Sequence, residues 1–214
     1  MRKGEIISLG IILLFFAVGA SLYPSMPEMM ASHWNIQGEV DGYMPKLWGL
    51  FLMPIVSLAL FLLLIFIPRL DPLKANVAKF RKYFDNFVAI VVLFLFYLHL
   101  LVIFWNKGAR FEMIQFLAPA FAILFYYAGV LTERAKRNWF IGIRTPWTLS
   151  NDKVWEKTHE LGGRLFKTSG VLALLGIVFP VYTIWFVLAP VLLTAIYTVS
   201  YSYFEYRRQT DVSL

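Results

Sequence analysis

The sequence contains no cysteine, which excludes both a disulfide framework and a thiolate metal site. Serine nucleophile elbows, phosphate-binding glycine loops and HExxH zinc motifs are also absent. Acidic residues are scarce, since 13 Asp and Glu stand against 20 Lys and Arg. These absences leave no pattern that predicts a catalytic site, a cofactor or a bound metal, and we expect a protein that is not an enzyme.

Long apolar runs dominate the sequence instead. Hydrophobic residues make up 59% of the 214 positions, above the roughly 45–50% of an ordinary soluble domain. Several runs approach or exceed the roughly 20 residues that cross a bilayer, and each must be a helix because lipid offers no partner for backbone amides. We therefore predict an all-α integral membrane bundle of six transmembrane helices, at about residues 5–23, 47–67, 87–105, 113–131, 165–179 and 183–204.

Two of these boundaries rest on specific features of the sequence. Arg2 and Lys3 precede the first run as in a signal peptide, but the run reaches Tyr23 without a clear small-residue cleavage site, which favours a retained span. The last apolar stretch, residues 171–204, would be roughly 51 Å long as one helix. Because the hydrocarbon core is only about 30 Å thick, we place a turn at Pro180 or just after it.

The basic residues predict the orientation of the bundle. With this layout all but three of the 20 Lys and Arg fall on one side, and the three exceptions are Lys46, Lys107 and Arg110. The positive-inside rule then places both termini in the cytoplasm, in a multi-pass protein of the cell membrane. A basic excess in such a protein indicates loops that face anionic lipid, and we expect no direct binding to nucleic acid.

The predicted external loop, residues 24–46, has the composition of an ordered cap. Prolines stiffen its start, and Gly38 and Gly42 suit tight turns. A single histidine without paired ligands at set spacing argues against a metal site. We therefore favour a folded cap in which His33 and Trp34 are packed or hydrogen-bonded. The side chains that could gather around a cation are Glu28, His33, Glu39 and Asp41.

A second mixed segment, residues 138–166, lies on the predicted cytoplasmic side. It contains three tryptophans and a near balance of four basic and three acidic residues. Gly142 permits a turn, and the residue before Pro146 is biased to extended backbone. This composition favours specific packing against the bundle or a partner over simple attraction to anionic lipid.

The second half of this segment predicts a cytoplasmic amphipathic helix. Ser150 or Asn151 can cap it, and Asp152 suits the positive end of the helix dipole. From there apolar residues recur at three- and four-residue steps, so the helix is expected to lie at the membrane interface before the fifth span. Gly162 and Gly163 mark either a bend or a close approach between helices.

Three titratable residues have two interpretations each. His99 lies in the third predicted span, where an ionisable side chain indicates function by default, although a neutral, hydrogen-bonded histidine near the external end is the more ordinary case. Arg144 and His159 either contact lipid headgroups and internal partners or take a direct part in function. No nucleophile accompanies His159 in the local pattern.

Two stretches resemble a known family. "FIGIRTPWTLSNDKVWEKTHELGGRLF" resembles the signature of the SdpI family of bacterial and archaeal membrane proteins, and "MASHWNIQGEVDGYMPK" resembles the N-terminal module that often precedes it. The candidates for external recognition in the N-terminal module are His33, Trp34, Asn35, Gly38, Asp41, Gly42 and Lys46. The candidates for cytoplasmic recognition in the signature are Arg144, Thr145, Pro146, Trp147, Ser150, Asn151, Trp155, His159, Gly162 and Gly163.

The sequence has no internal repeat and no low-complexity linker, so we predict one membrane domain over residues 1–214. In it residues 1–67 form the N-terminal module, and residues 132–206 hold the signature and the last two spans. The family resemblance implies protection against a secreted antimicrobial peptide or protein toxin. It also implies signalling, in which toxin engagement lets the membrane protein hold a cytoplasmic DNA-binding repressor. The expected partners are therefore the lipid bilayer, a secreted toxin and a repressor protein.

Two other functions are compatible with the sequence. Pro54, Pro119 and Pro180 mark places where the helices of a small-solute transporter or channel could be broken, with His99 in the pathway. Against this, the spans carry almost no charge. The amphipathic segment would also suit a structural protein that interacts with lipid.

Overall fold

The chain is a multi-pass membrane protein built mostly of helices. The computed structural model describes residues 2–35 and 37–211, and six helices in that range are long and apolar enough to cross a membrane. Their bounds are α1 Lys3–Leu22, α2 Lys46–Leu70, α3 Lys74–Asn106, α4 Met113–Arg134, α6 Asp152–Ala173 and α8 Thr183–Asp211. The shorter elements are η1 Tyr23–Ser25, β1 Met29–Trp34, β2 Val40–Pro45, α5 Pro146–Ser150, α7 Leu175–Val178 and η2 Pro180–Tyr182. The predicted six-helix membrane bundle is confirmed, with one small hairpin added.

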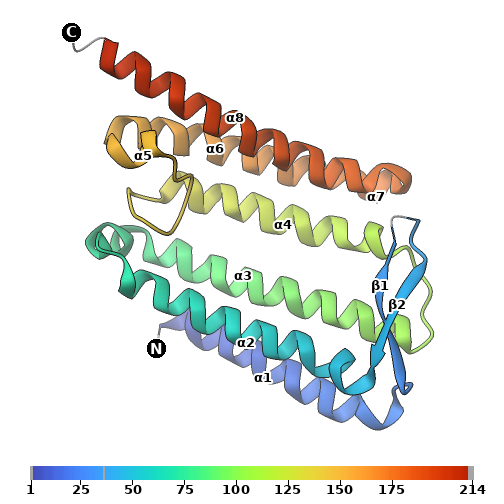
Figure 1. Cartoon of the computed structure of the whole chain (residues 1–214). Helices are drawn as coiled ribbons and strands as arrows, with labels where there is room; N and C mark the ends of the chain where they lie inside the picture. Colours follow the sequence, from blue (N-terminus) through green and yellow to red (C-terminus); the bar gives the residue numbers. More distant parts are fainter. Residues whose placement is uncertain (1, 36, 212–214) are drawn as a thin grey trace.

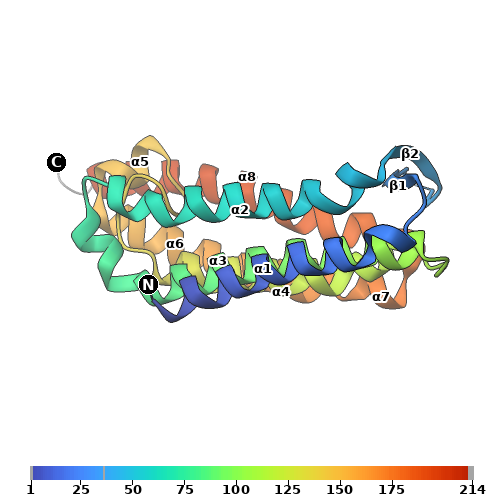
Figure 2. The same ribbon diagram turned by 90° about the horizontal axis from the view of Figure 1, so that it is seen from below.

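The six long helices lie side by side in an elongated bundle (Figure 1). α3 and α4 are neighbours at its centre, α1 and α2 pack against α3, and α6 and α8 extend the bundle beyond α4. Both termini and α5 lie at one end, and the hairpin of β1 and β2 lies at the other (Figure 2). We call these the termini end and the hairpin end.

The third helix begins earlier than predicted. It starts at Lys74 rather than near residue 87, so that boundary was wrong. Its first turns carry basic side chains outside, but Val77, Phe80 and Phe84 are buried in the core. Hydropathy missed these turns because the charged outer face lowers the average, although the spacing of three and four residues keeps an apolar stripe inside.

The fifth span also differs from the prediction. The amphipathic segment and the span form one helix, α6, which continues through Gly162 and Gly163. The predicted start of this span at residue 165 was therefore wrong. Of the two interpretations of Gly162 and Gly163, the close approach between helices is confirmed and the bend is not. The chain then passes through α7 and turns at η2, Pro180–Tyr182, which confirms the predicted turn.

The close approach joins α6 to α4. A Cβ placed on Gly129 of α4 would lie 2.5 Å from the carbonyl oxygen of Gly163, and one placed on Gly170 would lie 2.6 Å from the carbonyl oxygen of Ala122. Small residues at such points let two helix backbones approach closely. Close approach increases the van der Waals contact that helps helices associate in lipid. Beside them, Nζ of Lys167 lies 2.6 Å from Oε1 of Glu133 and adds a polar tie.

One core cluster spans the bundle toward the termini end, because it draws residues from α1, α2, α3, α4 and α6. Its buried members are Ile12, Phe61, Val77, Phe80, Phe84, Val88, Val92, Leu131, Ala135, Ile141 and Trp155. A smaller cluster of Met26, Met30, Leu50 and Ile103 lies beneath the hairpin. Each end of the bundle therefore has its own cluster of packed apolar side chains.

Replacing Gly129 by alanine tests the α4–α6 contact. We expect Gly129→Ala to lower the free energy of unfolding by about 1–3 kcal/mol, because the added methyl meets backbone that cannot give way. The matched control is Gly10→Ala in α1, where nothing lies within 4 Å of the added carbon. That change should be neutral or stabilise by up to about 1 kcal/mol. Thermal unfolding in mild detergent measures both, and equal melting temperatures would contradict the packing argument.

Candidate functional site

The segment predicted to form an external cap is an antiparallel hairpin of β1 and β2 (Figure 1). Its register pairs His33 with Gly42, where an added Cβ would lie only 2.8 Å from Cβ of His33. Nδ1 of His33 lies 2.5 Å from Oδ1 of Asp41, and these side chains are 70% and 46% exposed. A contact between two side chains that are this exposed adds little stability.

Asn35 and Gly38 shape the hairpin turn. Oδ1 of Asn35 accepts hydrogen bonds from the amides of Gln37 and Glu39, at 3.0 and 2.9 Å. Gly38 has a φ of +81°, and a Cβ there would lie 2.7 Å from Oε2 of Glu112. The turn thus accounts for the presence of both residues, because Asn35 binds its amides and Gly38 provides its positive φ.

Trp34 and Lys46 fasten the hairpin to its surroundings. The ring of Trp34 meets Trp105 edge-on at a centroid distance of 5.5 Å. Nζ of Lys46 lies 2.7 Å from Oε1 of Glu28. Of the seven residues predicted for external recognition, two are classed as exposed, namely His33 and Asp41.

Asn106 at the end of α3 was missed by the sequence analysis. Its Oδ1 accepts a hydrogen bond from the amide of Ala31 at 2.8 Å, and its Nδ2 donates to the carbonyl of Ala31 at 3.0 Å. The side chain thereby acts as an extra strand partner for β1. No local pattern reveals this contact, because the two residues are far apart in the sequence.

At the termini end, Trp155 and His159 lie inside the protein. Trp155 is 1% exposed, and its Nε1 donates to the carbonyl of Ala135 at 2.9 Å. The ring of His159 stacks on Trp155 at 3.8 Å. Its Nδ1 donates to the carbonyl of Trp155 at 2.9 Å, while Nε2 accepts from the amide of Ile143 at 3.0 Å. A ring with one donor and one acceptor is a neutral imidazole, so His159 holds the loop in place.

Thr145 connects the signature to α8. It caps α5 by accepting a hydrogen bond from the amide of Thr148 at 3.1 Å, with Pro146 as the first helical residue. Its Oγ1 also lies 3.0 Å from Oγ of Ser202. Trp147 then packs edge-on against Tyr203 at 5.1 Å.

The cap of α6 is Asn151, while Ser150 belongs to α5. Oδ1 of Asn151 accepts hydrogen bonds from the amides of Lys153 and Val154 at 2.9 and 3.2 Å. Of the two predicted capping residues, Asn151 is therefore the one that caps the helix. A Cβ on Gly162 would overlap the side chain of Ile143. Gly142 has a φ of +112°, and a Cβ there would overlap the ring of His159.

Two further residues that hold the loop were also missed. Asn138 is fully buried, and its Oδ1 accepts from the amide of Ile141 at 2.6 Å while its Nδ2 donates to the carbonyl of Lys136 at 2.8 Å. Oδ2 of Asp71 accepts from the amide of Trp139 at 2.9 Å and so ties the loop to the α2–α3 connection. Asn138 stood inside the predicted segment, but nothing in the pattern separated it from its neighbours.

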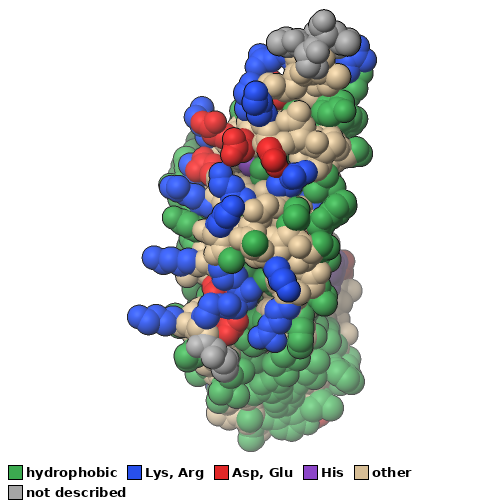
Figure 3. Space-filling model, turned by 90° about the vertical axis from the view of Figure 1, so that its left-hand side faces the viewer, with side chains coloured by type: hydrophobic (Ala, Val, Ile, Leu, Met, Phe, Trp, Pro, Cys, Tyr) green, Lys and Arg blue, Asp and Glu red, His purple; other side chains and the backbone are tan. Residues whose placement is uncertain are grey.

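Two aromatic side chains of this loop are exposed. Trp139 is 51% exposed and Phe140 is 39% exposed. Arg144 is also exposed, and its Nη1 donates to the carbonyl of Trp139 at 2.8 Å. Lysines and arginines gather over the same end of the molecule (Figure 3). We call Trp139, Phe140 and Arg144 the aromatic tip.

A pair of glycine substitutions tests whether His159 locks the loop. Gly142→Ala should destabilise the protein by more than Gly108→Ala, because both force a side chain onto a positive φ but only the first also meets a buried ring. We expect a difference of about 1–3 kcal/mol, from the loss of one buried contact and its hydrogen bond. Thermal unfolding and protease cleavage of the 138–151 loop measure it. Equal loss in the two variants would mean that backbone strain alone matters.

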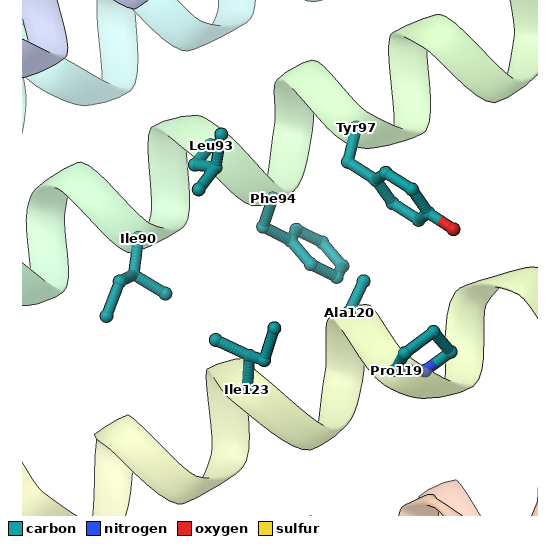
Figure 4. Close-up of a pocket in the computed structure, with 7 residues that line it drawn as sticks. All are labelled: Ile90, Leu93, Phe94, Tyr97, Pro119, Ala120 and Ile123. Carbon is teal, nitrogen blue, oxygen red and sulfur yellow. The ribbon is translucent and has the colours of Figure 1, made fainter.

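The middle of the bundle contains an apolar hollow between α3 and α4 of about 280 Å³ (Figure 4). Its lining residues are Ile90, Leu93, Phe94, Tyr97, Pro119, Ala120 and Ile123. The hydroxyl of Tyr97 already donates to the carbonyl of Phe116 at 2.8 Å. The hollow is thus lined by apolar side chains and by one hydroxyl that already has a partner.

His99 is buried in α3 and stacks on Phe15 at a centroid distance of 5.3 Å. Neither ring nitrogen has a hydrogen-bond partner among residues 2–35 and 37–211. An ion or proton pathway needs a series of polar partners, and none contacts this ring in that range. Within the described chain, no three His, Asp or Glu side chains converge as a metal site either.

Comparisons with known proteins agree with the two recognised stretches. Residues 134–202 match the model of the SdpI/YfhL protein family, and residues 10–58 match a domain of unknown function (DUF1648). The chain is 25% identical over 207 residues to "Immunity protein SdpI" of Bacillus subtilis (strain 168), covering 96% of this chain and 97% of that protein. No solved structure matches. The resemblance to the SdpI family is thus confirmed.

Proposed function

We propose that this chain, which carries the SdpI/YfhL family region, is a membrane immunity protein that protects its cell from a secreted antimicrobial peptide or protein toxin. The observation that carries the proposal is the similarity to Immunity protein SdpI along nearly the full length of both chains. Both modules of the chain are then one functional unit. A binding role without catalysis fits the sequence, which lacks the catalytic motifs considered above.

The orientation we propose places the termini end in the cytoplasm. Supporting it, Lys and Arg gather at that end of the bundle (Figure 3), as the positive-inside rule requires of cytoplasmic loops. The hairpin end then faces outward.

The hairpin is our candidate for toxin contact. Its outward side chains are not used to hold the fold, since the pair of His33 and Asp41 is open to solvent. Tyr43 on β2 is also exposed and supplies an aromatic surface beside them. Aromatic and charged groups together are typical of binding hot spots.

The aromatic tip is our candidate for contact with a cytoplasmic repressor. The internal residues of the signature, Trp155 and His159 among them, position the loop and are not free to bind. Trp139 and Phe140 are the exposed rings of that loop. A signalling role therefore rests on these rings and on Arg144.

Cysteine labelling tests the orientation on a clean background, because the chain has no cysteine. Gln37→Cys at the hairpin turn and Lys153→Cys at the start of α6 both replace exposed residues. A membrane-impermeant maleimide should label the first variant in intact cells and the second only after permeabilisation. The opposite pattern would reverse the proposed topology.

Toxin challenge tests whether the protein confers immunity and whether the hairpin takes part in it. Cells that lack the gene are complemented with the wild-type chain or with His33→Ala/Asp41→Asn, and exposed to each secreted toxin encoded nearby. We expect the double variant to tolerate about tenfold less toxin, equivalent to about 1.4 kcal/mol of binding. Lys107→Gln, an exposed charge at the same end outside the hairpin, is the control and should protect fully. Equal survival with and without the gene would reject immunity.

The same cells test signalling. Trp139→Ala/Phe140→Ala should protect as well as the wild type, yet the repressor should no longer follow the membrane fraction after toxin exposure. Trp185→Ala, which removes an exposed tryptophan from the start of α8, is the control and should retain the repressor. If the repressor still followed the membrane fraction in cells with the double variant, the aromatic tip would not be its contact site.

A further inference from the structure

A hollow of about 540 Å³ opens at the termini end, where the start of α1, the end of α2 and the first turns of α3 meet. Three basic residues line it, namely Arg2, Lys74 and Arg81. The rest of its wall is mostly apolar and includes Pro68, Val77 and Ala78. We call it the basic hollow. A cationic rim beside an apolar wall is the pattern expected for a lipid headgroup.

The length of α3 is compatible with a basic hollow at headgroup depth. The stretch of α3 from Asp85 to Asn106 is about 33 Å long at about 1.5 Å per residue, enough to cross the roughly 30 Å hydrocarbon core of a bilayer. With this stretch in the hydrocarbon core, the turns of α3 before Asp85 project into the headgroup region. Nε of Arg2 lies 2.6 Å from Oδ2 of Asp85, so the start of α1 is held at the same level.

The charges around the hollow leave a positive surplus. Arg2 and Arg81 are balanced by two buried carboxylates: Arg2 contacts Glu5 at 2.5 Å, and Nε of Arg81 lies 2.7 Å from Asp85. Nη2 of Arg81 also lies 3.5 Å from Oε1 of Glu5. Lys74 is exposed and has no ion pair or side-chain hydrogen bond within the described residues. Its charge is therefore free to meet an anion.

The backbone at the start of α3 uses its own hydrogen bonds. The amide of Lys74 donates to the carbonyl of Asp71 at 3.1 Å, and the amides of Asn76 and Val77 donate to the carbonyl of Leu73 at 2.8 and 3.3 Å. The helix is also kinked at Phe80. An anion at the rim would therefore be met by the side chain of Lys74 and not by the helix terminus.

We propose that the basic hollow binds the phosphate of an anionic phospholipid, with the side chain of Lys74 at the phosphate and the acyl chain along Pro68, Val77 and Ala78. The lipid would fill the space between the end of α2 and the starts of α1 and α3, which ion pairs hold together. The site is separate from the hairpin and from the aromatic tip, so it stands or falls independently of toxin immunity.

Native mass spectrometry of the full chain, released from mixed micelles of phosphatidylglycerol and phosphatidylcholine, tests the proposal. The wild type should retain phosphatidylglycerol in preference to phosphatidylcholine. Lys74→Gln should reduce that retention about fivefold, the effect expected of one basic residue near a membrane surface. Lys82→Gln is the matched control, since it removes an exposed charge from the same helix outside the hollow. It should retain the lipid as the wild type does.

A second variant tests the shape of the hollow without a change of charge. Ala78→Trp should fill the apolar wall and also lower the retention of phosphatidylglycerol, while thermal unfolding in phosphatidylcholine micelles reports whether the variant is folded. Inorganic phosphate at millimolar concentration should not displace the lipid. Equal retention by Lys74→Gln and the wild type, no preference over phosphatidylcholine, or displacement by inorganic phosphate would each overturn the lipid site.

Discussion

Helices in hydrocarbon gain almost nothing from burying apolar side chains against one another, because the lipid is equally apolar. The bundle therefore depends on how closely its backbones approach. Gly129, Gly163 and Gly170 provide that approach between α4 and α6, and the ion pair of Lys167 with Glu133 lies beside it. The rest of the signature is positioned from this contact, because α6 carries the residues that hold the preceding loop.

Polar groups then fix each end of the bundle. Asn106 completes the edge of β1 at the hairpin end, and Asn138 and Asp71 hold the loop at the termini end. Buried groups of this kind are costly to leave unpaired, so each contact restricts its segment to one arrangement. The outcome is a polar network at each end of a bundle whose interior is mostly apolar, with His99 buried and without a hydrogen-bond partner among the described residues.

This arrangement changes the meaning of the recognised motif. Several residues that the motif offered as one recognition surface lie inside the protein. Trp155, His159 and Thr145 each use their polar atoms on backbone or side chains of the same chain. Trp139 and Phe140, which were not among the candidates, are the exposed rings of the loop. Much of the motif therefore describes how the loop is built.

The sequence by itself determined the six spans, the turn at Pro180 and the separation of charge between the two ends, because these follow from local composition and from the thickness of a bilayer. It failed at the start of α3, where charged residues on one face hid a buried stripe, and at residue 165, where two glycines looked like a bend. Only the tertiary structure decided which polar side chains point inward, since the partners of Asn106, Asp71 and Thr145 come from distant parts of the chain. Helical periodicity assigns a residue to a face, but the atoms that meet that face are set by the packing of other helices.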